Sequence, residues 1–265
     1  MNYNTILTIA GSDSGGGAGV QADIKTISAN GGYAATVITA STAQNTQTVL
    51  DVYPLPLLHI EAQLDALLSD IEFNAVKIGM LYSLEILELV EQKLEEYGVT
   101  KIVLDPVMLS TSGKRLLTQE AIERLKLFIP KLYLLTPNIP EAEILLDKKI
   151  SKSNLEESAR ELTQKYRVSV LLKGGHLENS NTLIDTLCIK DTLKIIKIEH
   201  QAIDTKNTHG TGCTLSSAIA TYIGFGYSLE ESVKKGCSYL HKAIVSGKDK
   251  LLGKGRGGVN HFCIV

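Results

Sequence analysis

Short apolar runs rich in β-branched residues alternate along the chain with longer segments in which apolar residues recur at helical spacing. The short runs have the length and composition of buried strands. We therefore predict strands at residues 5–10, 34–40, 48–53, 75–78, 102–104, 132–135 and 168–172. Helices are predicted at residues 20–28, 57–69, 84–96, 118–128, 155–165, 211–225 and 229–245. Continuously apolar strands that alternate with helices indicate an α/β fold with a central, mainly parallel sheet flanked by helices on both faces.

Residues 184–199 depart from this alternation, because they hold two β-rich runs around Lys190 and Asp191 and predict a hairpin. No linker, low-complexity stretch or repeat of fixed period divides the chain. We therefore expect residues 1–265 to form a single α/β domain.

Composition excludes several classes of protein. The chain carries 27 Lys and Arg against 29 Asp and Glu, a net charge of −2, so it has no basic surplus for binding nucleic acid. No stretch approaches the ~20 apolar residues of a membrane span, so no membrane partner is expected. The four cysteines, Cys188, Cys213, Cys237 and Cys263, are scattered without a CxxC pair. We expect neither a zinc site nor disulfides, and a reducing, cytoplasmic compartment.

Polar and glycine residues gather where the predicted strands end. Ligands of open α/β sheets bind beyond the carboxyl ends of the strands, so these positions predict one site. They are residues 11–19, Gln44-Asn45, Gly79-Met80, Asp105-Pro106, Asn138 and residues 173–176.

The glycine-rich segment GSDSGGGAG at residues 11–19 lies between a predicted strand and a predicted helix. It formally matches a dinucleotide fingerprint, but residues 37–45 lack the acidic residue that this fingerprint expects, and no P-loop motif is present. Its glycines favour a ligand wall where the backbone approaches closely, and the alternative is a flexible turn. A second glycine motif, residues 253–258, has no strand before it and is expected to be a surface tail.

The segment THGTGC at residues 208–213 opens a predicted helix. Backbone N–H groups and the helix dipole at such an end form an anion pocket, which suits a transferred phosphoryl group. Cys213 lies where a helix N-terminus would lower the pKa of a thiol. The alternative is a glycine-rich helix start with a small packing cysteine.

Four further polar residues follow predicted strands. Asn138 and Glu141 have the spacing of a helix capping box, and they also suit a hydrated Mg²⁺; both interpretations are compatible. Lys173 is predicted either to contact a phosphate or to be a solvent-exposed residue at a strand end. Asp105 is predicted either to face the site or to be a turn residue that ends its strand. Residues 107–117 form either a closing lid or an ordinary loop.

Together these motifs resemble the hydroxymethylpyrimidine/phosphomethylpyrimidine kinases of thiamin biosynthesis, within the ribokinase-like superfamily. The resemblance runs roughly from Ile6 to Phe262 and rests on LTIAGSDSGGGAGVQADIKT, VITASTAQNT, KIGML, VLDPVM, LTPNIPEAEILL, LLKGGH and TKNTHGTGCTLSSAIA. It implies a ribokinase-like fold and ATP-dependent phosphorylation of 4-amino-5-hydroxymethyl-2-methylpyrimidine, first to the monophosphate and then to the diphosphate. Because the chain ends soon after this region, no fused thiamin-phosphate synthase domain is expected.

The resemblance also implies site residues. The pyrimidine would lie near Gly11, Ala18, Asp23, Gln44, Met80 and Val107. Asp23 and Gln44 would hydrogen-bond it, and Met80 would pack against its ring. ATP would be held by Lys173, Asn138 and the neighbourhood of Thr208, with Mg²⁺ near Asp105, Asn138 and Glu141. The anion hole would be Gly210, Thr211, Gly212 and Cys213.

Many superfamily relatives carry an Asp base at the position of Cys213. This sequence has Cys there instead, and the pyrimidine kinases also have Cys at this position. Two roles stay open: a thiolate that accepts the hydroxyl proton, which we favour, or a thiol that only positions substrate. The nearest alternative activity is pyridoxal kinase, but residues 107–117 lack the lid cysteine of bifunctional relatives. A non-catalytic binding module on the same scaffold is the alternative of another class. Relatives are often homodimers, and we expect the same here.

Overall fold

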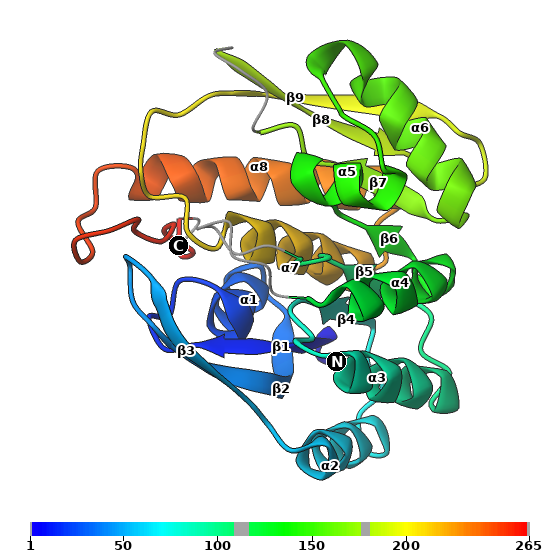
Figure 1. The fold of residues 1–265 in the computed structure, drawn as a ribbon. Helices are drawn as coiled ribbons and strands as arrows, with labels where there is room; N and C mark the ends of the chain where they lie inside the picture. The colour runs from blue at the N-terminus through cyan, green and yellow to red at the C-terminus, as the bar shows by residue number, and fades with distance from the viewer. Residues whose placement is uncertain (1, 109–116, 176–180, 264–265) are drawn as a thin grey trace.

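The computed structural model describes residues 2–108, 117–175 and 181–263. Within these ranges the strands form one nine-stranded sheet, ordered β3-β2-β1-β4-β5-β6-β7-β8-β9 (Figure 1). The strands are β1 (Thr5–Asp13), β2 (Tyr33–Gln44), β3 (Val49–Pro54), β4 (Ala75–Ile78), β5 (Ile102–Leu104), β6 (Leu134–Leu135), β7 (Ser169–Leu172), β8 (Thr182–Cys188) and β9 (Ile195–Gln201).

The sheet is parallel in its centre and antiparallel at both edges. Strands β2, β1, β4, β5, β6 and β7 run parallel to their neighbours in that order. Strand β3 pairs antiparallel with β2, and β8 and β9 form an antiparallel hairpin beside β7. The predictions of a mainly parallel sheet and of a hairpin within residues 184–199 are therefore confirmed.

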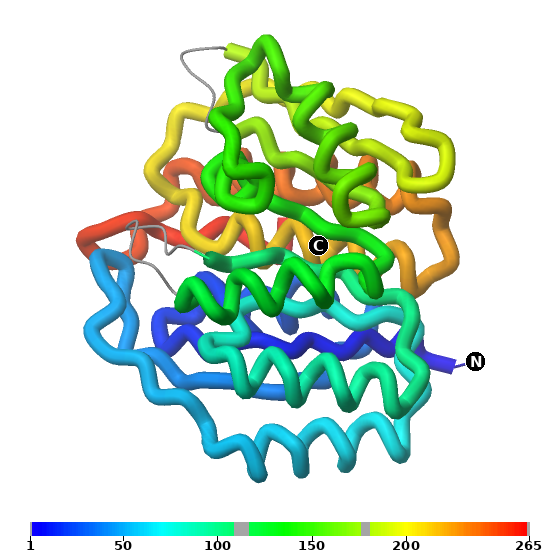
Figure 2. The backbone as a smooth tube through the Cα atoms, turned by 45° about the vertical axis from the view of Figure 1, so that its right-hand side comes forward, coloured from blue at the N-terminus to red at the C-terminus, as the bar shows by residue number. Residues whose placement is uncertain are grey.

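Helices cover both faces of the sheet. They are α1 (Gly19–Ala29), α2 (Leu57–Leu68), α3 (Leu84–Glu96), α4 (Gln119–Phe128), α5 (Ile139–Leu146), α6 (Leu155–Tyr166), α7 (Thr211–Gly224) and α8 (Leu229–Gly247), with short 3₁₀ turns at Ile129–Lys131 and Lys152–Asn154. Helices α2 to α6 contribute to one apolar cluster, and α1, α7 and α8 to a second cluster on the opposite face. In Figure 2, α2, α3 and α4 cross the front of the sheet one above another.

Alternation along the buried strands divides side chains between these two clusters. On β4, Val76 and Ile78 join the first cluster and Ala75 the second. Successive side chains of a strand point to opposite faces, so both faces of the strand are apolar, as a doubly covered sheet requires. One residue of β4 breaks this pattern: Lys77 is fully buried and lies on the α1 and α7 face.

Local signals explain where the helices begin. The predicted N-cap Thr118 is confirmed, because its Oγ1 accepts a hydrogen bond from the Ala121 N–H at 3.3 Å. The predicted capping box of Asn138 and Glu141 is also present at the start of α5.

Two strands are longer than predicted. The apolar run ends at Ala10, but β1 continues through a bulge to Asp13, and β2 continues to Gln44. The ladder with β2 alone carries β1 past Gly11, because pairing with β4 ends at Ile9. Glycine is a poor strand former, and the register shifts beside it as at a bulge. Gly11, Asp13 and Gln44 are therefore strand residues rather than loop residues.

The chain order of the strands reverses between β1 and β4, since β2 lies on one side of β1 and β4 on the other. In α/β sheets the carboxyl ends at such a switch point form a crevice that binds ligands. Here those ends carry Gly11 and Asp13 on β1 and Gly79-Met80 after β4.

Candidate active site

A buried ion pair, Lys77 with Asp23, lies between the sheet and the helices beneath the strand ends of the site. Lys77 Nζ lies 2.9 and 2.8 Å from the two carboxylate oxygens of Asp23, and both side chains have no exposed surface. Thr8 and Ser217 donate to the same carboxylate at 2.6 and 2.7 Å. Burial by itself would lower the pKa of Lys77, but the neighbouring acidic groups, Asp23 foremost, together outweigh that effect and hold the pKa above its usual range. This cluster joins β1, β4, α1 and α7.

The resemblance implies that Asp23 hydrogen-bonds the pyrimidine, and in this structure its carboxylate is fully buried. Its oxygens accept hydrogen bonds from Lys77, Thr8 and Ser217, and its exposed fraction is 0%. In this arrangement Asp23 has no surface with which to bind a pyrimidine directly. The reason is the neighbouring strand: register pairs Thr8 with Lys77 on the face that α1 covers, so Asp23 meets a lysine there.

Cys213 lies in the first turn of α7, one turn before Ser217, so both residues share a helix face. The predicted lowering of its pKa is wrong. Burial raises the pKa of the Cys213 thiol to about 11; Lys77 lowers it, whereas Asp23 and Asp105 raise it further. The backbone N–H of Gly19 also lowers this pKa without reversing its direction. The side chain is half-buried, and the raised pKa favours the neutral thiol at pH 7.

The start of α7 faces a second ion pair. Lys173 Nζ and Asp105 Oδ1 are 2.6 Å apart, and both side chains are largely buried. A Cβ added at Gly212 would lie 2.9 Å from Asp105 Oδ2 and 3.5 Å from Lys173 Nζ. The first N–H groups of a helix have no acceptor inside the helix, so they are available to an anion there. A lysine, a carboxylate and these N–H groups therefore meet at one point.

Asn138 and Glu141 adjoin this point. Asn138 forms an isolated parallel bridge with Lys173, which follows β7. The Asn138 N–H donates to Glu141 Oε2 at 2.8 Å, and the Glu141 N–H donates to Asn138 Oδ1 at 3.0 Å. Burial raises the pKa of Glu141 to about 7; Lys173 opposes this rise and Asp105 adds to it. Two buried carboxylates thus share the positive charge of one lysine side chain.

The glycine-rich loop is organised by Asp13, at the end of β1. Its carboxylate accepts hydrogen bonds from the N–H groups of Gly15, Gly17 and Ala18 at 2.8 to 3.0 Å. His209 Nε2 lies 2.9 Å from the same carboxylate. Burial alone would raise the pKa of Asp13, but the bonds from His209 and from the backbone outweigh it and hold the pKa below its usual value.

Gln44 is held beside this loop. Its Nε2 lies 3.2 Å from His209 Nε2, and Thr42 donates to its Oε1 at 3.3 Å. An amide side chain offers both donors and an acceptor, so a residue held in this way can read a heterocycle. Thr208 and His209 precede α7, so the loop that carries them connects the glycine-rich segment to the anion pocket.

Close contacts with this chain's own backbone explain several glycines. A Cβ on Gly210 would lie 1.8 Å from the carbonyl oxygen of Gly17, and one on Gly19 would lie 2.3 Å from that of Gly11. Both have positive φ angles, which glycine adopts most readily. The ligand wall predicted from these glycines remains a prediction, because their requirement follows already from loop-to-loop packing.

The glycine segment near the C-terminus lies at the surface, with Gly253, Lys254 and Arg256 exposed, but it is packed rather than a free tail. The Arg256 N–H donates to the Thr46 carbonyl at 2.8 Å, and the His209 N–H donates to the Gly257 carbonyl at 3.1 Å. A Cβ on Gly255 would lie 2.0 Å from the Thr46 carbonyl oxygen. This segment therefore packs between the β2–β3 turn and the loop before α7.

The other predicted substrate residues lie at adjoining strand ends. A Cβ on Gly11 would lie 2.5 Å from Met80 Cε, so these two residues are in contact. Ala18, Gln44, Met80 and Val107 are each half-buried, which leaves surface for a ligand.

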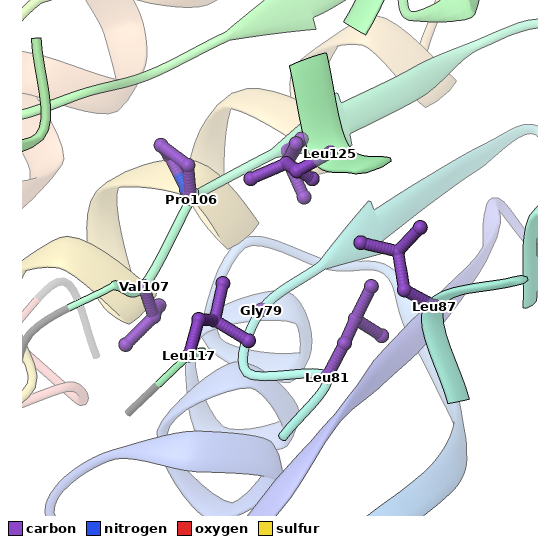
Figure 3. Close-up of a pocket in the computed structure, with 8 residues that line it drawn as sticks. Gly79, Leu81, Leu87, Pro106, Val107, Leu117 and Leu125 are labelled. Carbon is purple, nitrogen blue, oxygen red and sulfur yellow. The ribbon is translucent and has the colours of Figure 1, made fainter. Parts of the chain in front are cut away.

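Beside Val107 the structure contains a small apolar pocket. It is lined by Gly79, Leu81, Leu87, Leu104, Pro106, Val107, Leu117 and Leu125 (Figure 3). The pocket lining contains none of the charged residues of the site. It therefore represents a gap in packing next to the site and not the site itself. Of the predicted lid, residues 109–116 lie outside the described residues, as does His176.

Sequence reasoning missed Asp13, Lys77 and His209. Lys77 carried a usable signal, because it is a single cation inside a four-residue buried strand, where a charge needs a partner. Asp13 and His209 carried none, since they are 196 positions apart in sequence.

A doubly covered, mainly parallel sheet whose carboxyl edge carries an anion-binding helix start, a lysine and carboxylates is typical of small-molecule kinases with the ribokinase-like fold. The chain belongs to the phosphomethylpyrimidine kinase family, whose model matches residues 13–260.

Full-length relatives agree with this assignment. The hydroxymethylpyrimidine/phosphomethylpyrimidine kinase of Salmonella typhimurium is 43% identical over 265 residues, covering 99% of this chain and 98% of that protein. The protein of the same name from Bacillus subtilis is 40% identical, with 99% and 96% covered. A thiamine biosynthesis bifunctional protein of Geobacter sulfurreducens is 44% identical over 97% of this chain, but this chain spans about half of that relative's length (52%).

Solved structures place the fold in the same group. The phosphomethylpyrimidine kinase of Clostridium difficile superimposes with a TM-score of 0.79 at 43% identity, covering 91% of this chain and 99% of that one. A pyridoxal kinase of Bacillus subtilis in an ADP complex gives 0.89 at 29% identity, with 99% of each chain covered. Among the helices in the described ranges, none combines the length and apolar character that a bilayer span needs.

Proposed function

We propose that this protein transfers the γ-phosphoryl group of ATP to 4-amino-5-hydroxymethyl-2-methylpyrimidine and then phosphorylates the monophosphate to the diphosphate, within thiamin diphosphate biosynthesis. One observation carries the proposal: the N-terminus of α7 at Gly212 lies against the Asp105–Lys173 pair. Phosphoryl transfer depends mainly on positioning and on stabilising charge at the transferred group, and these groups supply both.

The residues of the anion pocket would contact different parts of ATP. The N–H groups of residues 211–213 would receive the developing charge of the phosphoryl group, while Lys173 would pair with a phosphate oxygen. Thr208 accepts from the Thr211 N–H just before α7, and Asn138 bridges to Lys173, so both would bound the nucleotide.

The residues present fit a magnesium ion. Asp105, Asn138 and Glu141 offer oxygen atoms, the ligands that Mg²⁺ prefers. The raised pKa of Glu141 indicates buried negative charge that Lys173 does not fully compensate. Mg²⁺, when bound, would neutralise charge on the phosphates. These three residues would hold it, with Asn138 and Glu141 kept in place by the capping box.

The pyrimidine would lie over Gly11 and Met80, between Ala18 and Val107, with Gln44 directed at its polar edge. Asp23 would act from beneath by fixing Lys77 and Ser217 rather than by contacting the ring. Cys213 would face the hydroxymethyl oxygen and accept its proton as the O–P bond forms. The thiol pKa of about 11 makes the thiolate scarce at neutral pH but strongly basic.

Replacing Cys213 should affect the two phosphorylation steps unequally. The hydroxymethyl group must lose a proton, whereas the monophosphate is already anionic, so Cys213→Ala should reduce kcat/KM for the first substrate by about 10²-fold and much less for the second. Steady-state kinetics on both substrates measure this. Because the thiol pKa lies near 11, first-step kcat/KM of the unmodified protein should rise between pH 7 and 9, and the variant should lack that slope. Equal losses in both steps would exclude the base role.

Magnesium binding should depend on pH through Glu141. Its carboxyl group must be ionised to hold the ion, and its pKa is raised to about 7, so Mg²⁺ affinity should increase from pH 6 to pH 8 and then level off. Calorimetric titration with Mg²⁺ and a non-hydrolysable ATP analogue measures the affinity. Glu141→Gln preserves the capping box chemistry and should weaken binding while removing the pH dependence. An unchanged pH dependence in that variant would assign the titration to another group.

A substrate panel tests the proposed function. ADP release would be measured with Mg-ATP and, separately, 4-amino-5-hydroxymethyl-2-methylpyrimidine, its monophosphate and pyridoxal, with the mass of each product determined. We expect turnover of both pyrimidines and little of pyridoxal. Turnover of pyridoxal alone would assign vitamin B6 salvage instead, and tight binding without ADP release would indicate a binding module.

Two further proposals concern oligomeric state and cellular location. We propose a homodimer, which sedimentation velocity would test; apolar side chains exposed along the edge strand β3, Leu50 and Tyr53, support an interface there. We also retain a cytoplasmic location, which the four free thiols support.

A further inference from the structure

Three metal-ligating side chains meet on the α8 side of the β8–β9 hairpin. They are Asp185 on β8, His200 on β9 and Cys237 on α8, and their ligand atoms all lie within 4.8 Å of one another. His200 Nε2 is 3.1 Å from Asp185 Oδ2, and Cys237 Sγ is 3.9 Å from the same oxygen. Asp185 and Cys237 are buried, with 9% and 3% exposed, and His200 is half-buried.

Strand register produces this meeting. Asp185 is paired with Ile198 and Leu183 with His200, so Asp185 and His200 are diagonal neighbours on one face of the hairpin. Helix α8 covers that face, and its buried side brings Cys237 against it. The three residues come from three separate elements and leave no local motif in the sequence.

The geometry suits a zinc-type ion. Bond lengths of about 2.0 to 2.3 Å place tetrahedral ligand atoms roughly 3.3 to 3.8 Å apart. The two distances to Asp185 Oδ2, 3.1 and 3.9 Å, bracket that range. One imidazole, one thiol and one carboxylate are the donor types that Zn²⁺ binds in proteins, whereas Mg²⁺ takes oxygen ligands.

A fourth donor stands next to the cluster. His241 follows Cys237 by four residues on α8 and therefore shares its helix face. Its ring stacks with that of His200, with centroids 6.4 Å apart and planes at 23°. His241 or water would fill the fourth position.

We propose that Asp185, His200 and Cys237 form a binding site for a single zinc-type divalent ion, separate from the magnesium ligands of the proposed kinase site. Burial raises the pKa of Cys237 well above its usual value, and Asp185 adds to the rise. The ion displaces the thiol proton on binding, so its affinity increases with pH.

The site is connected to the phosphate-binding lysine. Asp185 Oδ1 accepts a hydrogen bond from the Gly174 N–H at 2.9 Å, and Gly174 follows Lys173 directly. A Cβ on Gly174 would lie 1.9 Å from the Ile184 carbonyl oxygen, so this turn is packed against β8. An ion held by β8, β9 and α8 would therefore fix the strand against which the Lys173 turn is built.

Cobalt provides a direct test, because Co²⁺ replaces Zn²⁺ and gives a thiolate charge-transfer absorption when sulfur coordinates it. The full chain would be titrated with Co²⁺ in excess Mg²⁺, which occupies oxygen-ligand sites. We expect one equivalent to bind with this absorption and one equivalent of Zn²⁺ to abolish it. Cys237→Ser should remove the absorption and weaken Zn²⁺ binding at least tenfold. His200→Gln, which alters a half-buried side chain, should also weaken it at least tenfold.

Controls separate this site from the other thiols. Cys263→Ser removes a half-buried thiol elsewhere and should leave the absorption unchanged. Zn²⁺ should raise the melting temperature of the unmodified chain and of Cys263→Ser but not of His200→Gln. Absence of the absorption, its survival in Cys237→Ser, or its loss in Cys213→Ser would each overturn the proposal. If Cys237→Ser does not fold, the His200→Gln binding result decides. Since the readouts are binding and melting, failure of the kinase proposal leaves the test intact.

Discussion

Gly212→Ala should nearly abolish phosphoryl transfer without unfolding the protein. The added Cβ would lie 2.9 Å from Asp105 Oδ2 and 3.5 Å from Lys173 Nζ, so the Asp105 carboxylate must move. That movement disturbs the 2.6 Å contact with Lys173 and crowds the N–H groups at the start of α7. Loss of one preorganised group at such a site costs about 10²- to 10³-fold in turnover. Steady-state kcat/KM with ATP and the hydroxymethylpyrimidine measures the loss.

Gly175→Ala is the matched control. An added Cβ there meets no atom within 4 Å among the described residues, and Gly175 is not among the glycines with positive φ. It should therefore retain activity near that of the unmodified protein. Gly212 also lacks a positive φ and lies in a helix, where alanine is favoured, so this gain should offset part of the cost of moving Asp105, and Gly212→Ala should stay folded with at most a moderately lower melting temperature. Normal turnover by Gly212→Ala would remove α7's N-terminus from the proposed mechanism.

Lys77→Met should destabilise the fold by about 3 to 5 kcal/mol, the usual cost of removing one partner from a buried ion pair. The Asp23 carboxylate would remain at 0% exposure with hydrogen bonds from Thr8 and Ser217 but without its cation. Because Asp23 holds the pKa of Lys77 above its usual range, the pair contributes fully at neutral pH and is lost only in strongly alkaline solution. Urea denaturation at pH 7 gives the change in free energy of unfolding.

A second substitution distinguishes charge from packing. Adding Asp23→Asn to Lys77→Met removes the buried negative charge and keeps an amide that can bond to Thr8 and Ser217, so the double variant should recover much of the loss. Lys149→Met makes the same change at a lysine whose side chain is 94% exposed and should stay within about 0.5 kcal/mol. A Lys77→Met protein as stable as Lys149→Met would contradict the assigned role of the pair.

The local residue pattern predicted most of the fold because the residues within each strand or helix favour the element that the structure shows there. Apolar runs such as residues 75–78 have strand length, and Thr118 and Asn138 carry the side chains that start a helix. The ends of β1 and β2 were less predictable. Their last residues follow the pairing between strands, and β1 continues past Gly11 because β2 still pairs with Ser12 and Asp13.

The candidate site was predicted in part for the same reason. Residues at strand ends, such as Asp105, Asn138 and Lys173, converge in any parallel sheet, so their meeting follows from the order of elements. The burial and pKa of individual site residues did not follow from the order of elements. Asp23 was expected to contact the ligand, and its side chain is fully buried. Cys213 was expected to have a lowered pKa, and its pKa is raised instead. Both depend on desolvation, which requires knowing what covers a side chain.

The sequence by itself determined the α/β order of elements, the polar edge of the sheet, the helix caps and the motifs that carry the family resemblance. Each of these rests on residues close together in the chain. The tertiary structure alone decided the Asp23–Lys77 pair, the Asp13–His209 contact and the grouping of Asp185, His200 and Cys237. These contacts join distant segments through strand register and helix packing, and their charges are set by burial, so no local pattern of residues encodes them.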